Sequence, residues 1–468
     1  MATTANAWRI PPTLATPGAG AFWRATILTG IGTGLGAVLL TRLLELVQAL
    51  VWTGNIPSPG SPAETLLAAA RAAPAAKHMV ILLAAGVLTG LGQLALRHLA
   101  SGNGIETTQA IWFSAGRLPA LRTLGSAVLS VLIVALGASL GREGAAKQAG
   151  AVFANVASDR EGLSDDQRRL LVACGTGAGM AAAYGVPLGG ALFALEVMRG
   201  ALALRMVLPA MVTSLVAATV ALVGLPDAPT YVIPAYGSSA CVMVWAVVAG
   251  PLFGLVSVGY VRAVAWADRH KPLGTRRLFA PVAVLGALGA LSIPFPELLG
   301  NGRDVTQLAF VGQVGPWLLL ALAVLKPVAT IACLGSGAPG GLFTPSLTLG
   351  AMLGGFLGWA WAWVWPGTPP GLFAVLGAAA ILAATTQGPI SSVVLMMELT
   401  GRDRSFIAPM LLAVAVATVV ARTIEMRSIY EARLSDAEVA ERKMAREPLP
   451  NTAKAPSTPG AERAHWTD

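Results

Sequence analysis

Gly141-Arg-Glu-Gly-Ala-Ala-Lys-Gln-Ala-Gly150 has a counterpart in Gly341-Leu-Phe-Thr-Pro-Ser-Leu-Thr-Leu-Gly350, and both ends of the two blocks are 200 positions apart (341 − 141 and 350 − 150). A second pair lies downstream, because Pro187–Glu196 and Pro389–Glu398 each place a glutamate nine positions after a proline, and the two blocks are 202 positions apart (389 − 187). Two pairs at nearly one offset predict two homologous halves. Broken helices at matching places in such halves are typical of a transport site at the interface between them.

The composition indicates that most of this chain lies in a lipid bilayer. Of its 468 residues 55% are hydrophobic and only 12% are charged, whereas soluble domains carry about 25% charged residues. Four weakly charged runs are long enough, or nearly so, to cross a membrane: Gly125–Gly141, Leu204–Leu225, Val242–Val261 and Trp317–Leu334. Arg205 and Lys326 are the charges within them. The sequence therefore predicts an all-α polytopic membrane protein rather than a soluble protein with buried core helices.

The charged and metal-binding residue types argue against several function classes. The net charge of +9 comes from basic residues in loops and at the ends of the apolar runs, which the positive-inside rule produces without a nucleic-acid partner. The three cysteines lie in apolar surroundings and show no disulfide or metal spacing. The four histidines form no cluster. We therefore expect no enzyme, no metal and no cofactor.

The chain divides into four parts on these patterns. Residues 1–20 are predicted to be a flexible N-terminal segment, 21–225 a first membrane half, 226–435 a second membrane half, and 436–468 a disordered cytoplasmic tail. Within the halves, many apolar stretches of about ten to fifteen residues are too short to span upright, so we expect half-helices or re-entrant segments.

Three glycine-rich segments precede helical stretches: Gly102–Glu106 (GNGIE), Gly141–Ala145 (GREGA) and Gly340–Pro345 (GGLFTP). The N-terminus of a helix carries unpaired N–H groups and a partial positive charge, which suit an anion. Glycine lets the backbone approach that anion closely. Taken singly, each segment is an ordinary loop or packing point; three converging segments predict a site for a small anion.

These motifs resemble those of the CLC family of chloride channels and chloride/proton exchangers, whose filter segments read GSGIP, GREGP and GxFxP. Two wider runs, Gly335–Pro345 and Gly185–Glu196, also look like the family's own, and Tyr430, on the last transmembrane stretch, stands where the family places its pore tyrosine. The resemblance covers about residues 22–435. It implies a CLC-type fold, a homodimer with one pore per subunit, and chloride as the transported ligand. The short tail favours the prokaryotic type without paired regulatory domains, in a bacterial inner membrane.

The resemblance also implies roles for individual residues. Glu143 matches the gating glutamate, whose carboxylate occupies an anion position when closed and leaves it, or takes a proton, when open. Carboxylates at membrane depth are costly and usually functional. Backbone N–H groups of Leu342 and Phe343, the Asn103 amide and the Tyr430 hydroxyl are expected to bind the anion. The implied selectivity filter comprises Gly102, Asn103, Gly104, Ile105, Gly141, Arg142, Glu143, Gly144, Gly341, Leu342, Phe343, Thr344 and Pro345.

Simpler interpretations stand beside these roles. Glu143 could form a salt bridge with Arg142 or Lys147, and Tyr430 could be an ordinary interfacial tyrosine. Glu196 and Arg199, at the end of the next helix, are as consistent with a structural ion pair as with a role in transport.

Three departures from the family pattern leave the function open in detail. Asn103 replaces the usual serine, so the preference among chloride, nitrate and fluoride is undecided. Glu106 and Ala145 replace the usual prolines. Val197 stands where exchangers place an internal proton-handling glutamate, which favours passive conduction over proton-coupled exchange. A membrane scaffold without transport is a third hypothesis, but it gives no reason for Glu143 among three glycine-rich helix starts.

Overall fold

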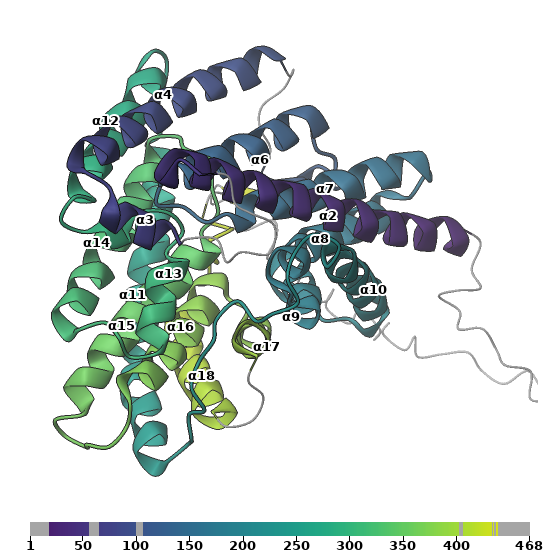
Figure 1. Cartoon of the computed structure of the whole chain (residues 1–468). Coiled ribbons are helices and arrows are strands. Elements are labelled where there is room, and N and C mark those ends of the chain that lie inside the picture. The colour runs from purple at the N-terminus through teal and green to yellow at the C-terminus, as the bar shows by residue number, and fades with distance from the viewer. Residues whose placement is uncertain are drawn as a thin grey trace, which may run out of the picture. The chain divides into compact units, whose positions relative to one another are not determined.

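The computed structural model of the chain describes residues 18–55, 65–99, 106–401, 406–432, 434 and 437–438. Within them the regular structure is helical, apart from one isolated β-bridge (Figure 1). The helices are α2 (Ala19–Gln48), η1 (Ala49–Thr53), α3 (Leu66–Ala72), α4 (Ala75–Leu99), α5 (Thr107–Phe113), α6 (Ala120–Ala135), α7 (Glu143–Arg160), α8 (Asp165–Tyr184), α9 (Pro187–Leu192), η2 (Phe193–Arg199), α10 (Leu204–Ala221), α11 (Ala240–Arg269), α12 (Arg276–Leu291), η3 (Pro296–Leu298), α13 (Arg303–Phe310), α14 (Pro316–Gly335), α15 (Phe343–Trp361), α16 (Pro370–Thr386), α17 (Pro389–Thr400) and α18 (Ile407–Ile424). The predicted all-α class is confirmed.

Six helices among the described residues are long and apolar enough to cross a membrane: α2 with η1, α4, α10, α11, α14 and α18. This confirms a multi-pass membrane protein. One predicted run is wrong as a continuous span, because α6 ends at Ala135 and Gly137 then takes a φ of 111°. A left-handed glycine of this kind breaks the helix, and the chain after it leads to the GREGA segment without further helix.

The two halves pack their helices in the same way. In the first, α7 lies against α8, and Gly150 approaches the backbone carbonyl of Gly175. In the second, α15 lies against α16, and Gly350 approaches the carbonyl of Gly377 in the same manner. A side chain at Gly150 or Gly350 would collide with the neighbouring helix backbone, so the repeated glycines serve this close contact. The two related halves with broken helices are confirmed, while the boundary at 225/226 stays a prediction.

A pair of hydrogen bonds joins the halves at equivalent positions. The N–H of Gly141 donates to the carbonyl of Gly341 at 2.8 Å, and the N–H of Gly341 donates to the carbonyl of Gly141 at 2.8 Å. The two segments run antiparallel. An antiparallel pairing of equivalent residues places a local two-fold axis at this bridge, which gives the relative orientation that the sequence left open.

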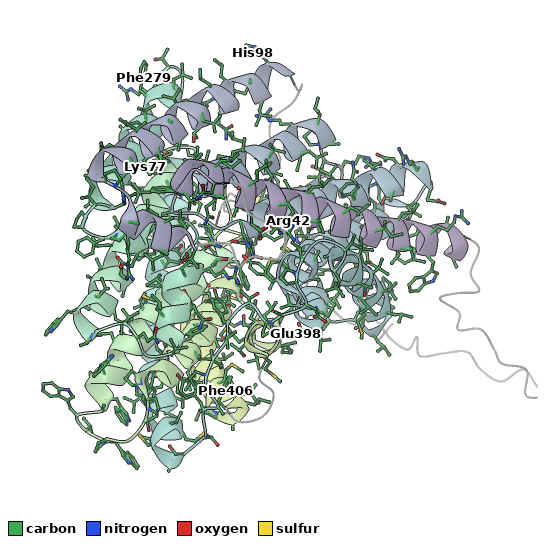
Figure 2. The ribbon with its side chains drawn as sticks, viewed as in Figure 1. Arg42, Lys77, His98, Phe279, Glu398 and Phe406 are labelled. Atoms are coloured by element: carbon green, nitrogen blue, oxygen red, sulfur yellow. The ribbon has the colours of Figure 1, made fainter. Side chains whose placement is uncertain are left out.

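A second connection between the halves is also reciprocal, and we call it the carboxylate clamp. Glu398, which Figure 2 labels, lies on α17 and accepts hydrogen bonds from the first N–H groups of α9, including that of Gly189 at 2.6 Å. Glu196, on η2, accepts in turn from the first N–H groups of α17, including that of Ser391 at 2.6 Å. Each carboxylate thus caps the helix start of the other half. The described ion pairs do not join Glu196 to Arg199, so the structural ion pair considered for these two is wrong.

Lys326, the charge inside the apolar run of α14, is buried with 1% exposure. Its ammonium donates to the backbone carbonyls of Leu298 and Gly300, each at 2.8 Å, and to that of Leu299 at 3.2 Å. A buried charge is tolerated when hydrogen bonds replace its hydration. Lys326 therefore anchors the segment after η3 to α14.

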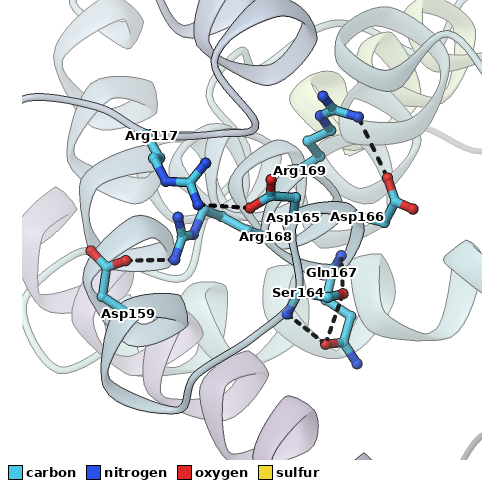
Figure 3. A network of polar contacts seen from close by, with 8 residues as sticks. All are labelled: Arg117, Asp159, Ser164, Asp165, Asp166, Gln167, Arg168 and Arg169. Carbon is cyan, nitrogen blue, oxygen red and sulfur yellow. Dashed lines mark hydrogen bonds and ion pairs between the residues drawn. The ribbon is translucent and has the colours of Figure 1, made fainter.

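A network of polar contacts fixes the turn between α7 and α8 (Figure 3). Arg168 pairs with Asp159 across the turn at 2.6 Å, and Arg117 pairs with Asp165 at 2.8 Å. Ser164 and Gln167 form a reciprocal capping box at the start of α8. The turn is thus held by side chains on both helices, which fixes α7, the helix that carries Glu143.

Candidate functional site

The Glu143 carboxylate occupies the N-terminus of a helix from the other half. Glu143 is the first residue of α7 and its side chain is fully buried. Its Oε1 accepts from the backbone N–H of Phe343 at 2.7 Å, and its Oε2 accepts from the Thr344 hydroxyl at 3.1 Å. A longer contact of 3.4 Å links Oε1 to the N–H of Thr344. The carboxylate therefore stands where an anion would meet the first N–H groups of α15.

The salt-bridge interpretation of Glu143 is wrong for the described residues. No ion pair within 4.0 Å joins Glu143 to Arg142 or to Lys147. The Arg142 guanidinium lies 5.2 Å from the centre of the Tyr184 ring, and the Lys147 ammonium lies 4.2 Å from the centre of the Tyr430 ring. Neutral donors, rather than a fixed positive charge, hold the carboxylate.

The glycines of the two motifs leave space for this carboxylate. A Cβ atom on Gly141 or on Gly341 would collide with the carboxylate of Glu143. A Cβ atom on Gly144 would lie 2.8 Å from the backbone nitrogen of Gly341, which is closer than such atoms approach. The spacing of glycines around Glu143 thus follows from the crowding at the bridge.

Sequence reasoning missed Tyr184, the last residue of α8. Its hydroxyl lies 2.8 Å from the Thr344 hydroxyl and 3.4 Å from Oε2 of Glu143. Tyr184 follows an alanine-rich stretch and belongs to no motif, so the sequence carried no signal for it. The structure adds Tyr184 to the groups that surround the carboxylate.

The residues directly before and after Glu143 in the sequence border two different cavities. Arg142 lines the first, which measures about 130 Å³ and is also bordered by Glu45, Arg303 and Asp304; we call it the Arg142 cavity. Gly144 lines the second, which measures about 170 Å³; we call it the Tyr430 cavity, and its border includes Lys147, Leu342 and Tyr430. Glu143, which lies between these two residues in the sequence and is buried, lines neither cavity.

A wider cavity of about 400 Å³ adjoins the Tyr430 cavity, because Gln93, Ser126, Gln148 and Lys271 border both. Its border contributes further basic side chains: Arg97, Arg122 and Arg277. Glu106 also borders this cavity, but the four basic side chains outnumber it and raise the local concentration of anions.

The second-half motif residues gather at the start of α15. Leu342 is the N-cap of that helix, buried with 2% exposure, and it borders the Tyr430 cavity. The N–H of Phe343 is engaged by Glu143. Thr344 donates its hydroxyl to the same carboxylate, and Pro345 is buried in the first turn.

Tyr430 borders the Tyr430 cavity, but it lies beyond the last transmembrane stretch on which the sequence placed it. The helix α18 ends at Ile424, and Glu425 takes an extended conformation. The following turn is held by the N–H of Ile429, which donates to the carbonyl of Thr385 on α16 at 2.7 Å. The ring of Tyr430 packs edge-on against Phe193, with 5.6 Å between the ring centres. A turn, rather than a helix, thus brings Tyr430 to the cavity.

The first motif falls outside the described residues, namely Gly102, Asn103, Gly104 and Ile105. The roles of these four residues therefore stay predictions. Glu106, Thr107 and Thr108, which follow them, border the Tyr430 cavity. Val197 is buried on η2 with 5% exposure, so an apolar side chain occupies the position at which exchangers carry a carboxylate.

The chain matches known proteins over most of its length. The family model described as voltage gated chloride channel matches residues 85–422. A ClcB-like protein of Ralstonia nicotianae is 32% identical over 414 residues, which are 86% of this chain and 94% of that protein. The H⁺/Cl⁻ exchange transporter ClcA of Vibrio parahaemolyticus is 30% identical over 63% of this chain and 65% of its own length.

Solved structures share the fold at lower sequence identity. A slow cyanobacterial Cl⁻/H⁺ antiporter superposes with a TM-score of 0.76 and 22% identity, over 91% of this chain and 99% of that one. A CLC-type fluoride/proton antiporter superposes with a TM-score of 0.69 and 22% identity, over 88% of this chain and 98% of that one. The family match, the relatives and the fold agree with the filter motifs, and this chain belongs to the CLC family of voltage-gated chloride channels and related transporters.

Proposed function

We propose that this protein transports chloride, or a similar small anion, across the plasma membrane along a path from the Arg142 cavity to the Tyr430 cavity. The observation that carries the proposal is the buried Glu143 carboxylate, bound to the N–H of Phe343 at the start of α15. A carboxylate and a halide compete for the same N–H donors, so one excludes the other. The geometry therefore supports a closed path in which Glu143 takes the place of an anion.

The path opens when the Glu143 carboxylate leaves the start of α15. Protonation favours departure, because a neutral carboxyl group is held less strongly by N–H donors than a carboxylate is. An anion then takes up the N–H groups of Leu342 and Phe343, with the Tyr430 hydroxyl and the Asn103 amide as further donors. No fixed counter-charge holds Glu143 among the described residues, so the exchange costs no broken ion pair.

The relatives are named for two different activities. ClcB of Citrobacter koseri is called a voltage-gated chloride channel, and ClcA of Vibrio parahaemolyticus is called an exchange transporter. Val197 favours conduction, because an apolar side chain cannot relay a proton from the Tyr430 cavity toward Glu143. Exchange of chloride or fluoride against protons is the second candidate; a chain of water molecules would have to replace the missing relay.

The remaining expectations follow the family. We propose a homodimer with one path in each subunit, in a bacterial inner membrane. The apolar helices support a multi-pass arrangement there. An enzymatic activity has no support in the donor set around Glu143, which consists of N–H and O–H groups suited to holding an anion.

Flux from liposomes distinguishes the two candidates. Purified protein is reconstituted with a chloride gradient and no proton gradient, and valinomycin with matched potassium holds the membrane potential at zero. Conduction predicts robust chloride flux without proton movement. Uphill proton movement driven by chloride would establish exchange instead, and the absence of any anion flux would refute transport.

A further inference from the structure

A lysine borders the proposed anion path one helical turn after Glu143. Lys147 lies on the same face of α7, four residues on, and is buried with 8% exposure. Its ammonium lies 4.2 Å from the centre of the Tyr430 ring and 5.5 Å from the centre of the Phe193 ring. Two aromatic faces stabilise a cation at this position.

The lysine also borders the Tyr430 cavity, together with Gly144 and Leu342. Building on the proposed function, we infer that Lys147 is an anion-binding residue, whose ammonium stabilises the transported anion in the Tyr430 cavity beside the position that Glu143 blocks. Tyr430 supports this role, because its ring holds the cation and the residue borders the same cavity.

The internal repeat argues against a packing role for the lysine. The equivalent residue in the second half is Leu347 (347 − 147 = 200), which is buried with 1% exposure on α15. An aliphatic side chain therefore satisfies the packing at this repeat position. A lysine at membrane depth is costly and is usually retained for function, so the charge itself requires an explanation.

The same charge opposes proton passage. An ammonium group attracts a chloride ion and repels a hydronium ion at equal distance with equal strength. Because Lys147 on α7 borders the Tyr430 cavity, its charge favours anions over protons there.

The test is chloride binding to the purified full-length protein, measured by titration calorimetry, with flux from liposomes alongside. Lys147→Gln removes the charge at similar length, and we expect the affinity for chloride to fall about ten-fold or more. Lys147→Arg keeps the charge and should bind chloride within about three-fold of the wild type. Arg276→Gln is the matched control, because this exposed arginine at the start of α12 borders none of the three cavities described above.

Failure of this inference differs from failure of the proposed function. If the wild type binds and moves chloride and Lys147→Gln does so with unchanged affinity, Lys147 is not an anion-binding residue, while transport stands. If the wild type neither binds nor moves any anion, the proposed function itself is refuted. Lys147→Leu reproduces the packing of Leu347 and serves if the glutamine variant unfolds; a folded leucine variant with wild-type affinity would also refute the role.

Discussion

Carboxylates fill helix starts at two places in this molecule, once in a symmetric pair and once singly. In the carboxylate clamp, Glu196 and Glu398 each cap a helix of the opposite half, with closest contacts of 2.6 Å in both. At the bridge, only Glu143 caps a helix of the opposite half, and the equivalent residue in the repeat is Phe343. A carboxylate at a helix start thus has a symmetry-related counterpart in the carboxylate clamp and none at the bridge.

We interpret the difference as one between a structural pair of carboxylates and the proposed gate. A contact that occurs in both halves is expected to hold the halves together. A contact that occurs in only one half is expected to serve the transport that we propose for the whole molecule. Lys147 and Leu347 are a second pair of equivalent positions that differ in charge, and Lys147 borders the Tyr430 cavity. In a pseudo-symmetric transporter, we therefore look for function where equivalent positions differ in charge.

The largest expected effect concerns the single carboxylate. Glu143→Ala should keep chloride flux at least as fast as in the wild type and make it independent of pH, because no carboxylate is left to occupy the start of α15. Chloride efflux from liposomes, recorded at several pH values, measures it.

Glu161→Gln is the matched control, at the far end of the same helix. The hydrogen bond from Arg24 lowers the pKa of Glu161, so its carboxylate stays ionised over the range scanned. Its variant should keep the wild-type pH profile. Loss of conduction in Glu143→Ala would show that the single carboxylate is structural after all.

The next effect concerns the symmetric pair. Glu196→Ala and Glu398→Ala each remove a carboxylate that accepts two backbone hydrogen bonds, and each should cost about 2 kcal/mol of stability, a shift of about 30-fold in the unfolding equilibrium. The two losses should be equal within about 0.5 kcal/mol, and we expect no change in the pH profile of the flux. Thermal unfolding in detergent measures the stability. A large loss for one variant and none for the other would show that the clamp is not reciprocal.

The smallest effect concerns the first filter segment, Gly102–Glu106. Asn103→Ser restores the family's usual residue, and a change of one or two hydrogen bonds to the anion permits about a five- to thirty-fold shift in the ranking of chloride, nitrate and fluoride. Competitive flux with the three anions measures the ranking. An unchanged ranking would place Asn103 outside the path.

Local patterns in the sequence were sufficient to predict the helices and the internal repeat. Apolar runs, and glycines and prolines at fixed spacing, act within a segment, so the two halves and the helix starts at Glu143 and Phe343 were predicted correctly. The interrupted run after Ala135 shows the limit, because nothing within Gly125–Gly141 distinguishes a helical glycine from Gly137 with its positive φ.

Contacts between distant segments could not be predicted. The hydroxyl of Tyr184 reaches Thr344 across 160 positions, and the turn at Tyr430 depends on a carbonyl of α16. The clamp required knowing that α9 and α17 face each other, although the repeat contained both glutamates. Apart from Tyr184, which belongs to no motif, the sequence identified these residues or their motifs, but only the packing of the halves shows which of them meet.

The bridge between Gly141 and Gly341 constrains how such a protein can have arisen by duplication. Each of these glycines lies against the one carboxylate present, and a Cβ on either would collide with it. A glutamate at both 143 and 343 would bring two like charges to one point on the local axis, where they repel strongly. Two identical halves with this bridge would therefore hold both glutamates in place only if one of them carried a proton. The single glutamate of this chain needs no such compensation.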